Sequence, residues 1–252
     1  MKKIMFLLML GVVFSSSAQR IKADKIKAGK DSLVIQPIFH ASVVFMWNGR
    51  VVYVDPHGGK SAFEGLPSPD IILITDVHPD HTDVETLKSI QTKSNTVFVM
   101  PYEVEKIIPK EIIKGETLLQ NGKEYTVRGI PIRTIPMYNL PEEADSKHPK
   151  GRGNGYVLTF GPKQVYISGD TEDIPEMRKL KDIDIAFVCM NLPYTMDIDQ
   201  ASSAVLEFAP KIVYPYHYRG KDGMSDTEAF KKLVNKGNPK IDVRLRNWYS
   251  KN

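Results

Sequence analysis

The segment Asp76-Val77-His78-Pro79-Asp80-His81 concentrates side chains that can bind a metal ion. It holds two imidazoles and two carboxylates, a ligand set that proteins use for zinc, iron and manganese. Alternate residues of an extended segment point the same way, so Asp76, His78 and Asp80 are expected on one side. The turn after Pro79 would then bring His81 beside them. The segment predicts a metal site, against the alternative of a solvated polar loop.

Two more residues follow apolar, strand-like runs. Asp170 comes just after the run 164–168, where a carboxylate could bind one metal or bridge two. Its alternative role is a helix cap before Pro175, because aspartate favours such positions. His217 follows the run 212–216, and its alternative role is a packed aromatic side chain among tyrosines. Loops after strands are where such folds place their sites, so both residues are candidate ligands.

His40 lies between two β-rich runs and has three interpretations. It is an additional ligand, a partner that orients Asp76, or a histidine satisfied in the core. The single cysteine, Cys189, lies in an apolar run and is expected to be a small buried hydrophobe.

The surrounding pattern moves from hairpins to alternating strands and helices. The turn Asn48-Gly49 is a strong hairpin signal. Strands are expected at residues 32–39, 41–46, 50–54, 71–75, 96–100, 116–119, 124–127, 130–135, 155–160, 164–168, 183–189, 212–216 and 242–246. Helices are expected at 83–91, 102–108, 175–180, 199–208 and from 225 to about 235, with capping boxes at Thr82 to Glu85 and Ser225 to Glu228. This order predicts an α/β fold in which two sheets pack face to face with helices outside.

The N-terminus has the pattern of a secretory signal peptide. Lys2 and Lys3 precede an apolar run, and small residues end at Ala18. Cleavage near Ala18 would leave residues 19–252 as one domain, starting with a linker at 20–30, in the periplasm or outside the cell. A short uncleaved anchor is the alternative, and no later segment is long and apolar enough to span a membrane. Cleavage lowers the net charge from +4 to +2, too weak a charge to predict nucleic-acid binding.

Together these residues resemble the metallo-β-lactamase superfamily, whose pattern is His-x-His-x-Asp-His, a middle histidine, a later aspartate and a last histidine. The residues that match in order are His78, Asp80, His81, Asp170 and His217. The resemblance implies a four-layer αββα sandwich and a metal-dependent hydrolase. Within the superfamily the chain is similar to the branch of L-ascorbate-6-phosphate lactonase, through His40-Ala41-Ser42 and Val54-Asp55-Pro56.

The chain departs from the family pattern at two places. Asp76 stands where the first histidine is usual, and residues 135–139 lack the middle histidine. His148 either takes over that role or lies on a surface loop. Both departures affect the first metal position. The second position, formed by Asp80, His81, Asp170 and His217, keeps all its residues. One or two divalent ions are therefore expected.

The resemblance implies hydrolysis by a metal-activated water, with zinc foremost and manganese or iron as alternatives. Asp80 would be the catalytic residue that orients the water and helps to move its proton, and the bond would be an ester, lactone, amide or phosphodiester. Lys150, Arg152 and Arg219 would bind an anionic group of a small-molecule substrate, unless they form ordinary solvated basic loops. The alternative function is a non-catalytic protein that keeps the fold and binds a metal or a small molecule.

Overall fold

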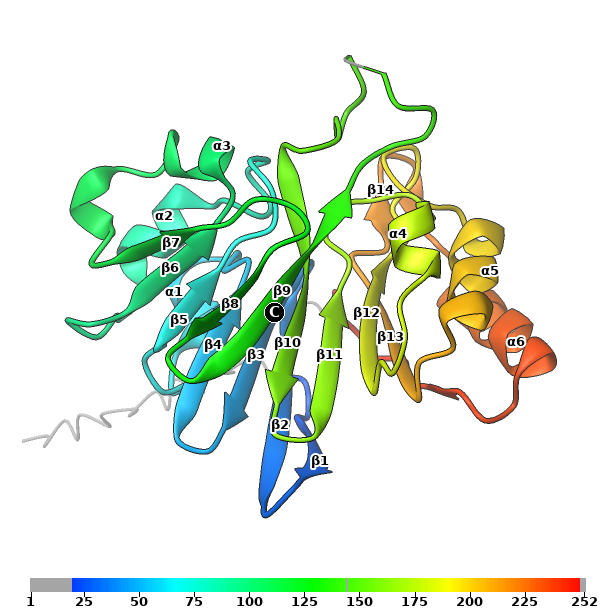
Figure 1. Ribbon diagram of the computed structural model, residues 1–252, viewed down its shortest axis with the longest axis horizontal. Coiled ribbons are helices and arrows are strands. Elements are labelled where there is room, and N and C mark those ends of the chain that lie inside the picture. Colours follow the sequence, from blue (N-terminus) through cyan, green and yellow to red (C-terminus); the bar gives the residue numbers. More distant parts are fainter. Residues whose placement is uncertain (1–19, 144, 250–252) are drawn as a thin grey trace, which may run out of the picture.

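Two seven-stranded sheets form the centre of the protein (Figure 1). The computed structural model describes residues 20–143 and 145–249, so the expected signal peptide lies outside the described residues. The first sheet has the order β1 (Asp24–Ala28), β2 (Asp31–Phe39), β3 (Ser42–Trp47), β4 (Arg50–Val54), β5 (Ile71–Leu73), β6 (Val97–Met100) and β7 (Glu116–Leu118). The second has the order β16 (Asp242–Val243), β13 (Ile212–Tyr216), β12 (Ile185–Cys189), β11 (Lys163–Ile167), β10 (Gly153–Phe160), β9 (Ile130–Met137) and β8 (Glu124–Val127).

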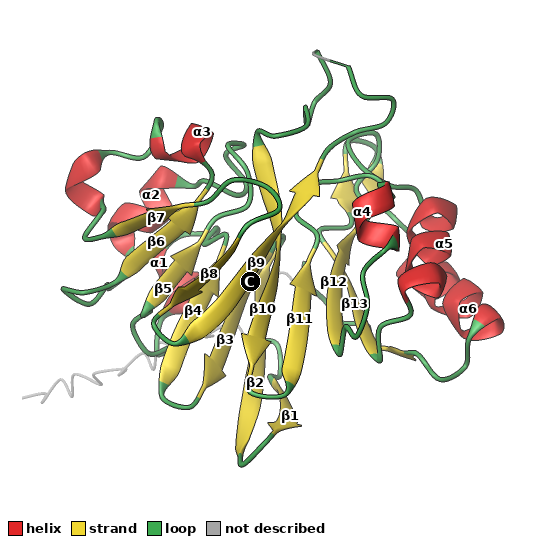
Figure 2. Ribbon diagram, in the orientation of Figure 1, coloured by secondary structure: helices red, strands yellow, loops and turns green. Residues whose placement is uncertain are grey.

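Helices cover the outer faces of both sheets (Figure 2). Beside the first sheet lie α1 (Lys60–Phe63), α2 (Val84–Ser89), α3 (Tyr102–Glu105) and the 3₁₀ turn η1 (Lys110–Ile112); beside the second lie α4 (Pro175–Arg178), α5 (Ile198–Phe208) and α6 (Thr227–Gly237). A small hairpin, β14 (Arg219–Gly220) and β15 (Gly223–Met224), follows β13. The arrangement confirms the α/β fold of the metallo-β-lactamase type, with helices, two sheets and helices in four layers.

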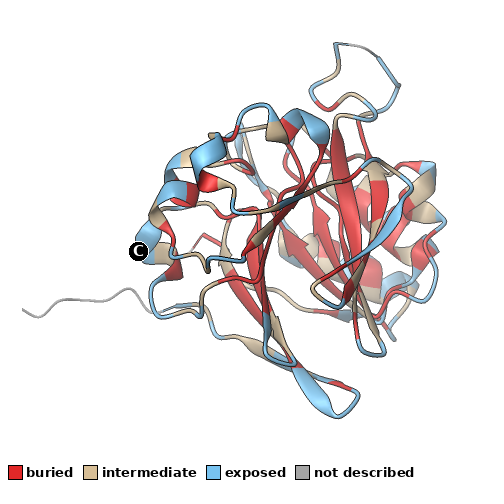
Figure 3. Ribbon diagram, turned by 60° about the vertical axis from the view of Figure 1, so that its left-hand side comes forward, coloured by how far each residue is buried: buried red, intermediate tan, exposed pale blue. Residues whose placement is uncertain are grey.

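Buried apolar side chains hold the layers together, and in Figure 3 the strands of both sheets consist largely of buried residues. The larger core lies between the sheets and includes Phe45, Phe160 and Phe187. A second core packs Phe63 of α1 and Leu87 of α2 against the first sheet. Apolar burial stabilises a fold by about 25 cal/mol per Å², so these two cores hold both sheets in place. The loops at the strand ends are therefore anchored to a stable framework.

Most expected elements are present, with corrections at their ends. Residues 20–30 were expected to be a linker, but β1 lies there and pairs antiparallel with β2. The helix 83–91 begins one residue later than predicted, because Asp83 and not Thr82 accepts the hydrogen bond of Thr86 N–H. Thr82 instead donates to the carbonyl of Asp76 at 2.6 Å, which ties down the segment before the helix.

Two further expectations concern the second half of the chain. The cap of α6 is Asp226, whereas Ser225 donates to the carbonyl of Met190. Cys189 is fully buried and free, as predicted. In the described part of the chain, none of the helices is long and apolar enough to cross a membrane.

Gly153 allows the two sheets to meet at the strand ends. The N–H of Asn154 donates to the carbonyl of Thr75 at 2.9 Å, so the start of β10 lies against the chain just after β5. A Cβ on Gly153 would lie 2.8 Å from that carbonyl oxygen and 2.6 Å from Cε of Met137. Only a glycine fits here, and the contact brings the loop before β10 next to Asp76.

Candidate metal centre

The candidate ligands gather where strands end at one edge of both sheets. The segment 76–81 follows β5, Asp170 follows β11, and His217 follows β13. Strands β4, β5 and β6 run parallel, as do β11, β12 and β13, so their carboxyl ends meet at the same edge. This topology brings together residues that are more than a hundred positions apart in the chain.

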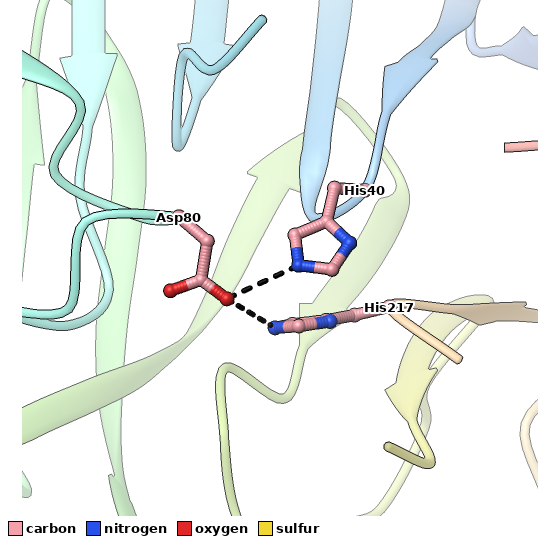
Figure 4. A group of neighbouring side chains, drawn as sticks. All are labelled: His40, Asp80 and His217. Atoms are coloured by element: carbon pink, nitrogen blue, oxygen red, sulfur yellow. Dashed lines mark hydrogen bonds and ion pairs between the residues drawn. The ribbon is translucent and has the colours of Figure 1, made fainter. Parts of the chain in front are cut away.

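We define the inner set as Asp80, His81, Asp170 and His217. Asp170 Oδ1 lies 3.1 Å from Nε2 of His217 and 3.3 Å from Nε2 of His81. The two Nε2 atoms are 3.2 Å apart, and Asp80 Oδ2 lies 3.4 Å from Nε2 of His217. Figure 4 shows Asp80 directed toward His217 and His40. The donor atoms of His81, Asp170 and His217 lie within 4.8 Å of one another, and Asp80 adjoins this group through His217. Asp170 is not the helix cap of its alternative interpretation, since α4 is capped at Ile174.

The chemistry of the inner set fits a divalent cation. Among the described residues, the buried Oδ1 of Asp170 has no partner with hydrogen-bond geometry, although two ring nitrogens lie close to it. Burial lowers the pKa of the His81 imidazole, but the carboxylates of Asp170, Asp55 and Asp80 outweigh burial and raise this pKa well above its usual value. The negative charge of these carboxylates also attracts a metal ion, and a bound ion would give Oδ1 of Asp170 the partner that it lacks.

Asp55 orients His81 and received no role in the sequence analysis. Its Oδ2 lies 2.8 Å from Nδ1 of His81, and both side chains are fully buried. Thr75 donates to the same carboxylate through both its N–H and its hydroxyl. With Nδ1–H donating to Asp55, the Nε2 lone pair of His81 points to the inner set. The signal was available, because Asp55 follows the apolar run that forms β4.

We define the outer set as Asp76, His78 and His148. Nδ1 of His78 lies 2.5 Å from Asp76 Oδ2, and Nε2 of His148 lies 3.9 Å from that oxygen. His148 is buried rather than on a surface loop, and its Nε2 lies 3.3 Å from Asp170 Oδ2, between the two sets. The structure thus pairs His148 with Asn139, at the end of the stretch 135–139 that lacks the middle histidine.

The expected geometry of the segment 76–81 was wrong in one respect. The N–H groups of His81 and Thr82 both donate to the carbonyl of His78, so the chain turns there instead of staying extended. Asp76 and His78 therefore point toward His148, whereas Asp80 points toward His217. A local turn of this kind overrides the alternation of an extended strand.

His40 contacts Asp80 and not Asp76, which one of its three interpretations had it orient, and it forms a candidate ligand group with Asp80 and His217. Its Nε2 lies 3.1 Å from Asp80 Oδ2, and its Nδ1 lies 2.7 Å from the hydroxyl of Tyr249. Burial is the main cause that lowers the pKa of His40 to about 4, so its ring is neutral at neutral pH. His40, Asp55 and His217 all have positive φ angles, a conformation unusual for such residues and often found at functional sites.

The three basic residues expected to bind substrate have different surroundings. Lys150 pairs with Glu142 at 2.8 Å and with Glu176 at 3.5 Å. The guanidinium of Arg219 stacks over the rings of Tyr249 and Phe39, at 4.5 and 5.4 Å from their centroids. In the described part of the chain it has no carboxylate partner, so Arg219 is the residue best placed to meet an anion.

Arg152 contacts the outer set directly. Its Nε and Nη2 atoms each lie 3.3 Å from one oxygen of Asp76, and Nη2 also donates to the carbonyl of Lys147 at 2.6 Å. The structure thus places Arg152 beside a candidate ligand.

The fold and this site together define a hydrolase of the metallo-β-lactamase type, and comparisons with known proteins agree. Residues 35–217 match the family model of the beta-lactamase superfamily domain. A UPF0173 metal-dependent hydrolase of Nanoarchaeum equitans is 30% identical over 188 residues, which cover 71% of this chain and 80% of the relative. A UPF0173 metal-dependent hydrolase of Staphylococcus carnosus is 28% identical over 217 residues, covering 81% and 94%.

A solved structure shows the same relationship. The protein from Parabacteroides distasonis, named as a metal-dependent hydrolase, is 39% identical with a TM-score of 0.79, and the match covers 90% of this chain and 98% of that one. The chain belongs to the beta-lactamase superfamily and, within it, to the UPF0173 metal-dependent hydrolases. It is a metal-dependent hydrolase, which sets aside the alternative of a non-catalytic binding protein.

Proposed function

We propose that the protein is an exported hydrolase that holds a divalent ion, zinc foremost, at the inner set. The observation that carries this proposal is the approach of two imidazole nitrogens, those of His81 and His217, to the unpaired Oδ1 of Asp170, with the carboxylate of Asp80 beside His217. When bound, a divalent ion lowers the pKa of water from 15.7 to about 7 and so supplies a nucleophile at neutral pH. The residues of the chain then have to hold the ion, orient the water and position the substrate.

Asp80 orients the attacking water rather than taking its proton. Burial opposes the charge of this carboxylate, but His81, His217 and His40 outweigh burial and hold the pKa of Asp80 well below its usual range. A carboxylate that stays ionised accepts a hydrogen bond and keeps the water in place. Its side chain is 34% exposed, in contrast to the buried His81 and Asp170, so Asp80 borders the opening to solvent.

The substrate is a small molecule that carries an anionic group near an ester, lactone, amide or phosphodiester bond. The stacked guanidinium of Arg219, two residues after His217, supports the anion, because it offers planar donors at low entropic cost. The resemblance to the L-ascorbate-6-phosphate lactonase branch favours a lactone or ester among these bonds. A net charge of only +2 without Lys2 and Lys3 supports a small-molecule substrate over nucleic acid.

Two measurements test the proposal. Protein purified without chelator should contain a divalent metal, and His81→Ala and Asp170→Ala should lower both the metal content and the hydrolysis of a panel of lactones, phosphodiesters and β-lactams. Full metal occupancy in both variants would exclude the inner set as the binding site. N-terminal sequencing of the protein from the periplasm or medium should begin at Gln19, and an intact Met1 would argue against cleavage.

A further inference from the structure

Arg152 occupies the side of the outer set where a second ion would be expected. Its guanidinium lies 3.3 Å from both oxygens of Asp76, and Nη2 lies 3.5 Å from Nε2 of His78. Asp76 is fully buried, and the side chain of Arg152 is 23% exposed. The only carboxylate of the outer set thus already has a cationic partner.

The position of Arg152 follows from the backbone around it. Arg152 directly precedes Gly153, whose close approach to Thr75 places the start of β10 beside the residue before Asp76. The carbonyl of Lys147 accepts a hydrogen bond from Nη2, and the carbonyl of Pro149 accepts one from the N–H of Arg152. The backbone of Arg152 and its guanidinium are therefore each held by the loop before β10, and the side chain does not extend into solvent.

The two sets differ in charge. The inner set has the carboxylates of Asp80 and Asp170, and in the described part of the chain no lysine or arginine pairs with either. In the outer set the single negative charge of Asp76 is matched by the positive charge of the Arg152 guanidinium. The free energy of binding a divalent ion is therefore much more favourable at the inner set than at the outer set.

We propose that Arg152 replaces the second metal ion, so that the protein binds one ion tightly at the inner set and uses a fixed guanidinium at the outer set. This inference rests on the proposed function only in placing the first ion at the inner set. The guanidinium supplies permanent positive charge and N–H donors beside the site. A second ion would supply positive charge but no donors. The aspartate at residue 76 is then the partner of an arginine, which explains why the usual histidine is absent.

The test is a count of bound ions in the full-length protein. Wild type and variants are equilibrated with Zn²⁺ by dialysis, and zinc per chain is measured by elemental analysis, with Zn²⁺ titration calorimetry as a second readout. Wild type should hold one ion. Arg152→Ala should hold two, because the affinity of the outer set rises by at least about ten-fold when the competing cation is removed. The double variant Arg152→Ala with Asp76→Asn should return to one ion.

Controls separate this effect from a loss of charge or of fold. Arg219→Ala removes a cation that does not contact Asp76, so its count should stay at one. Arg152→Gln, which keeps most of the side-chain length, replaces the alanine variant if circular dichroism shows that the latter does not fold. Two ions in wild type, or one ion in both Arg152 variants, would overturn the inference and leave the proposed function standing. No ion in wild type would overturn the proposed function itself.

Discussion

The carboxylate of Asp55 lies 2.8 Å from Nδ1 of His81, with neither side chain exposed to solvent. The pair joins the end of β4 to the segment after β5, so His81 cannot rotate without breaking a buried hydrogen bond. Such an arrangement of carboxylate and histidine sets which ring nitrogen carries the proton.

Asp55→Asn should weaken the binding of the metal by about 10- to 100-fold, because an amide no longer fixes the proton on Nδ1 of His81. Competition for Zn²⁺ with a chromophoric chelator measures this change. Asp70→Asn is the matched control, since Asp70 is also buried but pairs with Arg50 and Lys93 away from the site. Equal zinc affinity in Asp55→Asn and wild type would show that Asp55 has only a structural role.

Tyr249→Phe removes two hydrogen bonds of the hydroxyl, one with Nδ1 of His40 and one from the N–H of Arg219. It should lower kcat by about 2- to 10-fold, because each bond contributes about 0.5 to 1.5 kcal/mol and His40 then holds Asp80 less firmly. The metal content should not change, because the hydroxyl of Tyr249 bonds to His40 and to the backbone of Arg219 and, within the described part of the chain, to no residue of the inner set.

Tyr218→Phe is the control for this prediction. Its hydroxyl donates to the carbonyl of Arg246, and its ring packs on the edge of Tyr249. A loss of kcat as large in Tyr218→Phe as in Tyr249→Phe would attribute the effect to general packing.

Gly153→Ala should lower the free energy of unfolding by about 1 to 3 kcal/mol, because the added methyl group overlaps the carbonyl of Thr75 and the side chain of Met137. Urea titration followed by circular dichroism measures this change. Gly115→Ala serves as the comparison, since its Cβ would lie 3.9 Å from the nearest heavy atom, the carbonyl oxygen of Thr96. If both variants are equally stable, the close approach of β10 to Thr75 is not a constraint.

Stability should fall in acid in a way that depends on Asp70. Burial raises the pKa of this carboxyl, but Lys93, the N–H of Val51 and Arg50 outweigh burial and hold it below its usual value. A carboxylate with a lowered pKa stabilises the folded state above its unfolded pKa of about 3.9, and this contribution disappears as the pH falls through the folded pKa.

Asp70→Asn should therefore lower the free energy of unfolding by about 1 to 2 kcal/mol at pH 7 and by much less below pH 3. Urea titrations at both pH values measure the difference. Asp242→Asn should change little at either pH, because its pair with Arg244 is exposed to solvent. A difference between wild type and Asp70→Asn that is the same at both pH values would contradict this assignment.

Local patterns in the sequence were enough to predict the class of fold and most residues that gather at the candidate site. Apolar runs followed by the segment 76–81, by Asp170 and by His217 indicated which side chains meet, because parallel strands deliver their carboxyl ends to one edge. The hairpin at Asn48-Gly49 was equally local, and the structure has both residues at positive φ.

Only the tertiary structure decided which side chains share a set. The turn at His78 directs Asp76 and Asp80 to different places, where each meets side chains from distant segments, Arg152 for Asp76 and His217 for Asp80. His148 and Arg152 reach the site because a glycine lets β10 approach Thr75, an interaction between the two sheets. The distance between side chains on different sheets depends on how segments far apart in the chain pack together. The local order and spacing of residues do not determine that packing.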